Sequence, residues 1–123
     1  MAVGRAPAAA SPSGGDEMAK YLVIANYTSD GVKGLLKDGG SSRREAVKQV
    51  AEGLGGSLES FYFGFGADDA YITFDAPDNA TAAAASLVVN ASGAVTSRTV
   101  VLLTPEEMDA ATEKSVDYRP PGG

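Results

Sequence analysis

Two adjacent carboxylates, Asp68 and Asp69, are the residues of this sequence that most invite a chemical interpretation. Neighbouring carboxylates can raise the pKa of one of the pair, and a carboxyl group tuned in that way can act as a general acid or base. Asp69 is the better catalytic candidate, because it directly precedes a segment that carries Tyr71. Aspartate is also an ordinary turn residue that accepts hydrogen bonds from backbone N–H groups, and we favour that interpretation here.

Four aromatic and amide side chains could form a ligand pocket. Asn26 and Tyr27 end the first expected strand, while Tyr62 and Tyr71 lie on two later segments expected to pair as a hairpin. Tyrosines give a pocket apolar walls with polar tips. Asn26 or Tyr71 could also assist Asp69 in catalysis. The same tyrosines could equally pack at the edge of the core.

Arginines offer two further candidate sites. The segment 39–44 places backbone N–H groups beside Arg43 and Arg44 at an expected helix start, where a phosphate or carboxylate could bind. The spacing matches no nucleotide-binding loop, so a helix break with solvated arginines is the simpler interpretation. Arg98 lies within an expected strand. It could point inward and bind an anion, or, as we favour, it could lie at the edge of the sheet, where its charge would prevent pairing with another strand.

Composition narrows the possible functions. The 123 residues include no cysteine and no histidine, which excludes disulfides, thiolate nucleophiles and histidine chemistry, and no metal or other cofactor is expected. The net charge of −6 argues against nucleic acid and against anionic membrane surfaces as partners. No apolar run approaches the roughly 20 residues of a membrane span. No bulky apolar stretch follows the first residues, so we expect a cytoplasmic protein.

The chain divides into three parts by composition. Residues 1–17 are rich in Ala, Pro, Ser and Gly, which predicts a disordered tail. Residues 18–114 carry the periodic apolar patterns of a single folded domain, and residues 115–123 are expected to form an extended C-terminal tail.

Local signals within that domain predict alternating strands and helices. Strands are expected over residues 20–27, 57–65, 70–75 and 94–103. A helix beginning near Thr28 should break at Gly39 and Gly40, and a capping box of Ser42 and Glu45 should restart it. A later helix should open near 77–79, and a second capping box at Thr104 should begin a short terminal helix that runs to about residue 114. The apolar stripes expected to be buried on the helices are Val32, Leu35 and Leu36, then Val47, Val50, Ala51 and Leu54, and finally Ala80, Ala83, Ala84, Leu87 and Val88.

The order β-α-β-β-α-β predicts an α+β, ferredoxin-like fold with an antiparallel four-stranded sheet and both long helices on one face. Several strands are apolar on both faces. Alternation along residues 57–65 places Phe61, Phe63 and Phe65 opposite Leu58 and Tyr62, so one of the two sets should occupy the face without helices. A soluble monomer rarely exposes such a face, and we therefore expect a homodimer or higher oligomer in which two sheets form a dimeric α/β barrel.

Short motifs along the chain resemble those of GYD-domain proteins. The residues that carry the resemblance are Lys20–Val23, Asn26–Thr28, Gly31–Val32, Gly66–Asp69, Pro77–Asn79, and Ser92–Val95 with Thr99. Asp69 matches the aspartate of the Gly-x-Tyr-Asp turn that names the family, whereas Asp68 stands in place of its tyrosine. The resemblance implies a dimeric α/β-barrel relative, with a cleft between sheet and helices close to Asn26 and Tyr27. It implies no particular activity.

Two functional hypotheses follow. The first is a protein of assembly or small-molecule binding that uses the cleft between sheet and helices. The alternative is a cofactor-free oxygenase, isomerase or decarboxylase that uses Asp69 with Tyr71 or Asn26. The environment of Asp69 separates them: a carboxylate in a pocket beside a tyrosine favours catalysis, and a carboxylate bound to backbone amides favours binding.

Overall fold

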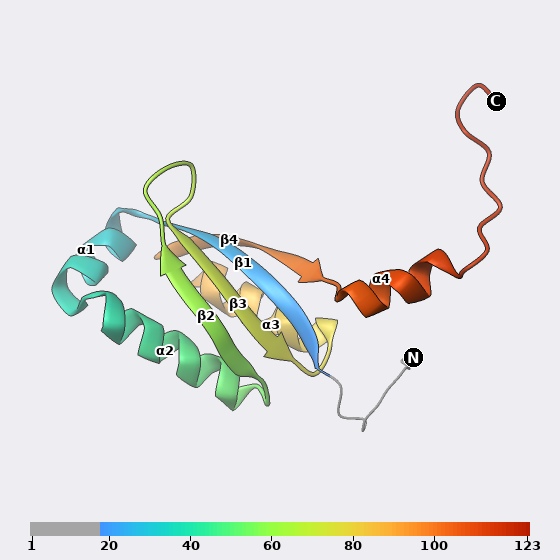
Figure 1. The fold of residues 1–123 in the computed structure, drawn as a ribbon. Helices are drawn as coiled ribbons and strands as arrows, with labels where there is room; N and C mark the ends of the chain where they lie inside the picture. Colours follow the sequence, from blue (N-terminus) through green and yellow to red (C-terminus); the bar gives the residue numbers. More distant parts are fainter. Residues whose placement is uncertain (1–17) are drawn as a thin grey trace.

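The computed structural model describes residues 18–123, and the tail predicted at residues 1–17 lies outside this range. Strands and helices follow one another along the chain as shown in Figure 1. They are β1 (Ala19–Tyr27), α1 (Ser29–Asp38), α2 (Gly40–Gly53), β2 (Ser57–Phe63), β3 (Ala70–Ala76), α3 (Asn79–Ala91), β4 (Val95–Leu102) and α4 (Pro105–Thr112). Residues 115–123 contain no helix or strand and are exposed.

The four strands form one antiparallel sheet in the order β2-β3-β1-β4. This order, with α2 and α3 on one face, is the predicted ferredoxin-like α+β fold (Figure 1). None of the helices in residues 18–123 has the length and apolarity needed to cross a membrane. The other face of the sheet carries no helix in the part of the chain that the structure describes.

The core lies between the sheet and helices α2 and α3. Alternate residues of the central strands point toward these helices, and Tyr21 and Phe74 stack there with ring centroids 5.3 Å apart. The hydroxyl of Tyr21 donates a 2.6 Å hydrogen bond to Oδ1 of Asn79, so the polar tip of this fully buried ring has a partner. Ala51 of α2 and Ala82 of α3 are the small buried residues through which each helix approaches the sheet.

Phe61 and Phe63 of β2 lie on the helix side, whereas Tyr62 lies on the other face. The pairing of β2 with β3 shifts at a bulge between Leu58 and Ser60, which places Leu58 on the same side as Phe61 and Phe63. The prediction that Leu58 lies opposite the phenylalanines, made from strict alternation, is therefore wrong. Phe63 packs against Tyr27 and the start of α2 rather than facing outward.

The hairpin between β2 and β3 turns through a longer loop than its sequence indicated. β2 ends at Phe63 rather than at residue 65, and residues 64–69 form the connection. The N–H of Gly64 donates to the carbonyl of Asp69 and closes the loop at 2.8 Å. Phe65 consequently lies in the loop, where its side chain is fully exposed.

The predicted break in the first helix is confirmed at Gly39. Its φ angle of +85° is a left-handed conformation that glycine adopts without strain, and α1 ends there. Helix α2 begins at once with Gly40, so Ser42 lies inside the helix and the predicted Ser42–Glu45 capping box is wrong. The other predicted box is present at α4, where Thr104 and Glu107 cap each other's backbone N–H groups.

Two of the predicted buried stripes largely face solvent instead, although Leu35 is half-buried, and Val50 of the remaining stripe is also exposed. Val32 and Leu36 of α1 are exposed, as are Leu87 and Val88 of α3, and the residues of α3 that face the sheet include Ala82. Helix α3 is apolar nearly all the way round, so its sequence pattern does not identify the inner face. The predicted stripe of α3 was wrong for this reason.

The start of α1 is held close to the start of β4. The N–H of Thr28 donates to the carbonyl of Ala94 at 3.0 Å, and the Thr28 hydroxyl caps α1 by accepting from the N–H of Gly31. A Cβ atom at Gly31 would overlap the carbonyl oxygen of Ala94, whereas one at Gly34 would meet nothing. Gly31 is therefore required for this contact.

We expect Gly31→Ala to destabilise the protein by about 1–3 kcal/mol, because the added methyl group must displace the backbone of Ala94. The matched control Gly34→Ala lies in the same helix and should stabilise by about 0.5–1 kcal/mol through the higher helix propensity of alanine. Urea denaturation followed by circular dichroism measures both. Equal effects of the two substitutions would contradict the close approach.

Candidate functional site

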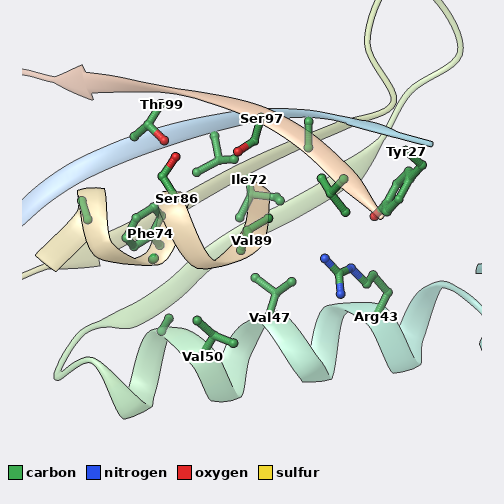
Figure 2. A pocket seen from close by; sticks show the side chains of 16 residues that line it. Tyr27, Arg43, Val47, Val50, Ile72, Phe74, Ser86, Val89, Ser97 and Thr99 are labelled. Carbon is green, nitrogen blue, oxygen red and sulfur yellow. The ribbon is translucent and has the colours of Figure 1, made fainter. Parts of the chain in front are cut away.

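A cavity lies between the sheet and helices α2 and α3 (Figure 2). The cavity has a volume of about 80 Å³. A single water needs only about 10–15 Å³, so the cavity has room for a small organic molecule. Its walls are largely apolar and include Val47 and Val50 of α2, Ile72 and Phe74 of β3, and Val89 of α3.

Polar side chains reach the cavity from two directions. Arg43 of α2 and Tyr27 of β1 stand at one end, as Figure 2 shows. The hydroxyl groups of Ser86, Ser97 and Thr99 line the side formed by α3 and β4. An apolar cavity with a few separated polar groups is the usual composition of a small-molecule site.

The guanidinium of Arg43 extends from α2 into the cavity, below Tyr27 in the view of Figure 2. Its central carbon lies 5.9 Å from the centroid of the Tyr27 ring, a distance at which a cation is attracted to an aromatic face. Arg44 lies elsewhere, beside Leu58 and Tyr62 near β2. The structure therefore separates the two arginines that the sequence placed in one anion site.

Asp69 is bound to the backbone of β1. Its Oδ2 atom accepts a 3.0 Å hydrogen bond from the N–H of Tyr27, and its own N–H donates to the carbonyl of Ala25 at 3.0 Å. The carboxylate thus extends the ladder between β1 and β3 past its last pair, Ala25 and Ala70. Asp69 borders an open groove together with Tyr27, Phe63 and Phe65, outside the cavity.

Asn26 and Asp68 form a polar cluster with Arg98 on the helix-free face. The Nδ2 atom of Asn26 donates to Oδ1 of Asp68 at 2.9 Å, and Nη2 of Arg98 lies 3.7 Å from Oδ2 of Asp68. Arg98 belongs to the edge strand β4, and its mostly exposed side chain lies beside the carboxylate of Asp68 on the helix-free face.

The residues proposed from the sequence as one pocket lie on two sides of the sheet. Tyr27 faces the cavity, whereas Asn26, Tyr62 and Tyr71 face away from the helices. Tyr62 and Tyr71 are direct partners across β2 and β3. The structure does not bring Tyr71 or Asn26 to the carboxylate of Asp69, whose hydrogen bond goes to the backbone instead.

Shifted pKa values occur away from the cavity. Nζ of Lys20 lies 2.9 Å from Asp75 and 3.0 Å from Glu59, and its hydrogen bonds, first to Asp75 and then to Glu59, raise the pKa of Lys20. The bond from Lys20 lowers the pKa of the exposed Glu59 carboxyl. Burial raises the pKa of the Tyr21 hydroxyl. These shifts come from ion pairing at the sheet surface and from core burial, so they do not mark a catalytic group.

The hydroxyl groups along the cavity were not identified from the sequence. Ser97 and Thr99 interrupt the apolar side of β4 between Val95 and Val101, and Ser86 interrupts an otherwise apolar stretch of α3. Such interruptions are the signal that could have found them. Asn90 holds this region together, because its Oδ1 atom accepts a 2.7 Å hydrogen bond from the N–H of Ser97.

A family model for the GYD domain matches residues 21–112. The chain belongs to the GYD domain family. The match begins on β1 and ends with the last residue of α4, so it includes every residue that lines the cavity and also the helix that follows the sheet. No curated protein and no solved structure matched the chain in the corresponding comparisons.

The geometry at Asp69 predicts a structural role that can be measured. Asp69→Ala should destabilise this GYD-domain protein by about 1–3 kcal/mol, because the N–H of Tyr27 loses its acceptor. Asp69→Asn retains an acceptor oxygen and should stay within about 1 kcal/mol of the parent. Thermal denaturation of both variants measures the difference. A loss in Asp69→Asn as large as in Asp69→Ala would show that the charge, rather than the acceptor, matters.

Proposed function

We propose that this GYD-domain protein binds a small, mostly apolar molecule in the cavity between its sheet and helices α2 and α3. The observation that carries the proposal is the cavity itself. The space lies between the sheet and the helices, where side chains are normally close-packed, and it opens to solvent beside Val50. A space with apolar walls and separated polar groups is the arrangement expected of a ligand site.

The surroundings of the candidate catalytic residues favour binding over catalysis. Tyr27 and Arg43 are the titratable side chains among the residues that line the cavity. The carboxylate of Asp69 is bound to a backbone N–H group, which is the arrangement predicted for a binding protein. A cofactor-free oxygenase, isomerase or decarboxylase would need a general base near its substrate, and Asp69 borders a different groove.

The proposal is tested with a neutral probe. Toluene added to the ¹⁵N-labelled protein should shift the amide signals of residues that line the cavity, because an apolar cavity of sufficient size takes up apolar molecules. Ala85→Leu should abolish these shifts, since Ala85 lines the cavity. The control Ala84→Leu lies on the exposed side of the same helix and should leave them unchanged.

Binding in the cavity would be contradicted if toluene shifted amide signals all over the surface. It would also be contradicted if the two variants gave the same amide shifts. Native mass spectrometry of freshly purified protein provides a second test. A retained small molecule that is lost in Ala85→Leu but kept in Ala84→Leu would support the proposal without any choice of probe.

We also propose that the helix-free face of the sheet binds a second copy of this chain. The residues that support this are apolar or aromatic and extend across all four strands: Leu22, Ile24, Tyr62, Tyr71 and Val100. Tyr62 is 71% exposed, and Tyr71 and Val100 are each 39% exposed. Exposed apolar surfaces of this kind are typical of interaction sites.

The size and setting of this face suit a homodimer. A stable pair typically buries about 800 Å² on each partner, and the open side of a four-stranded sheet is a surface of that order. Charged groups stand at its margins, with Lys20 and Asp75 at one end and Asp68 and Arg98 at the other. Helix α4 extends beyond the sheet with no buried residue of its own, which leaves it free to contact the second copy (Figure 1).

Two adjacent valines of β4 test this surface. Val100 points to the helix-free face and Val101 to the opposite side, and both are partly exposed. Val100→Asp should convert the dimer to a monomer, because it places a charge in a dry interface, whereas Val101→Asp should leave the dimer intact. Light scattering at micromolar concentration measures the mass. A monomeric parent protein would refute the interface.

A further inference from the structure

Arg43 carries a hydrogen-bond donor without an acceptor. Its Nε atom is buried, and no hydrogen-bond partner lies within reach of it in the part of the chain that the structure describes. Leaving a buried donor unpaired costs about 1–3 kcal/mol, and more when the group is charged. Native structures therefore supply partners to nearly all such groups, so the exception at Arg43 calls for an explanation, and a polar group of a ligand is one.

The groups around Arg43 do not compensate its charge. The face of the Tyr27 ring attracts the cation from 5.9 Å but carries no negative charge to balance it. Asp30 and Asp38 border a neighbouring groove to which Arg43 also contributes. Neither forms an ion pair with Arg43 among residues 18–123. The guanidinium stands at the end of the cavity, between that groove and the apolar walls (Figure 2).

We infer that the ligand of the cavity is a small monocarboxylic acid with an apolar body, and that its carboxylate binds the guanidinium of Arg43. This inference rests on the proposed function, since it names the class of molecule that the same cavity takes. The planar fork of a guanidinium matches the two oxygens of a carboxylate, and such bidentate pairs are stronger than neutral hydrogen bonds. The terminal nitrogens would be the first donors, and Nε, which a water molecule does not reach, would take part once the guanidinium turns toward the ligand.

The charge and the size of the site favour this class over other anions. Arg43 is the single cationic residue among those that line the cavity, so it suits one negative charge better than the two of a phosphate monoester. The remaining walls are aliphatic or aromatic apart from the hydroxyl groups of Tyr27, Ser86, Ser97 and Thr99, which suits an apolar body. The net charge of −6 gives no general attraction for anions, so affinity would depend on this local pair.

The test compares two probes of similar shape, toluene and benzoate, on the full-length protein. Isothermal titration and amide chemical shifts should show benzoate bound about ten- to one-hundred-fold more tightly than toluene. This order is opposite to their hydrophobicity, because benzoate is much the better hydrated of the two. The ¹⁵Nε–H signal of Arg43, assigned through its loss in Arg43→Lys, should move on addition of benzoate and stay in place on addition of toluene.

Substitutions then test whether Arg43 is the residue that binds the carboxylate of benzoate. Arg43→Met keeps an apolar side chain of similar length and should remove the preference for benzoate while toluene still binds. Arg43→Lys should keep part of the preference, because an ammonium group cannot form the bidentate pair. Arg44→Met is the matched control, since Arg44 is exposed and lies outside the cavity, and it should leave both affinities unchanged.

The outcomes distinguish the two proposals. Toluene binding with equal or weaker binding of benzoate would overturn the inference and leave the proposed function standing. Failure of both probes to reach the cavity would count against the proposed function as well. Undiminished benzoate preference in Arg43→Met would overturn the assignment of Arg43. If Arg43→Met does not fold, the Nε–H signal in the parent protein decides the matter, and an unmoved signal with bound benzoate overturns the inference.

Discussion

The geometry of the cavity depends on two backbone hydrogen bonds at the end of β1. The N–H of Tyr27 donates to the carboxylate of Asp69, and the N–H of Thr28 donates to the carbonyl of Ala94. Together they hold the end of β1 against both neighbouring segments at the point where α1 begins. This anchored backbone positions the Tyr27 ring, which closes one end of the cavity. Asp69 thus supports the site while standing outside it.

The break at Gly39 determines where Arg43 lies. An uninterrupted helix would continue the direction of α1, whereas the left-handed residue ends α1 and lets α2 begin in a new direction across the sheet. Arg43 stands in the first turn of α2, close to Tyr27, and Val47 and Val50 follow on the same side of the helix. The conformation of Gly39 therefore determines the direction of α2 and, with it, the position of Arg43 at one end of the cavity.

The two faces of the sheet carry different kinds of side chain for different purposes. Toward the helices, small and aromatic residues leave a cavity with one cation. On the other face, apolar residues in the middle strands are flanked by the ion pairs of Lys20 and Arg98. Most polar residues singled out for chemistry lie on this second face, where Asn26 and Asp68 bond to each other. This hydrogen bond gives Asn26 and Asp68 a structural role.

The features of the fold that the sequence by itself determined are those that depend on residues close together in the chain. The order of strands and helices, the break at Gly39 and the capping box at Thr104 follow from turn and capping chemistry that acts over a few residues.

The tertiary structure alone decided which side chains share a site. The bulge after Leu58 moved this residue to the side of Phe61 and Phe63, because register is settled between strands rather than within one. The inner face of α3 was decided by packing, since a helix that is apolar all round has no preferred side. Arg43 meets Tyr27, and Asp69 meets the backbone of β1, because folding brings distant segments together.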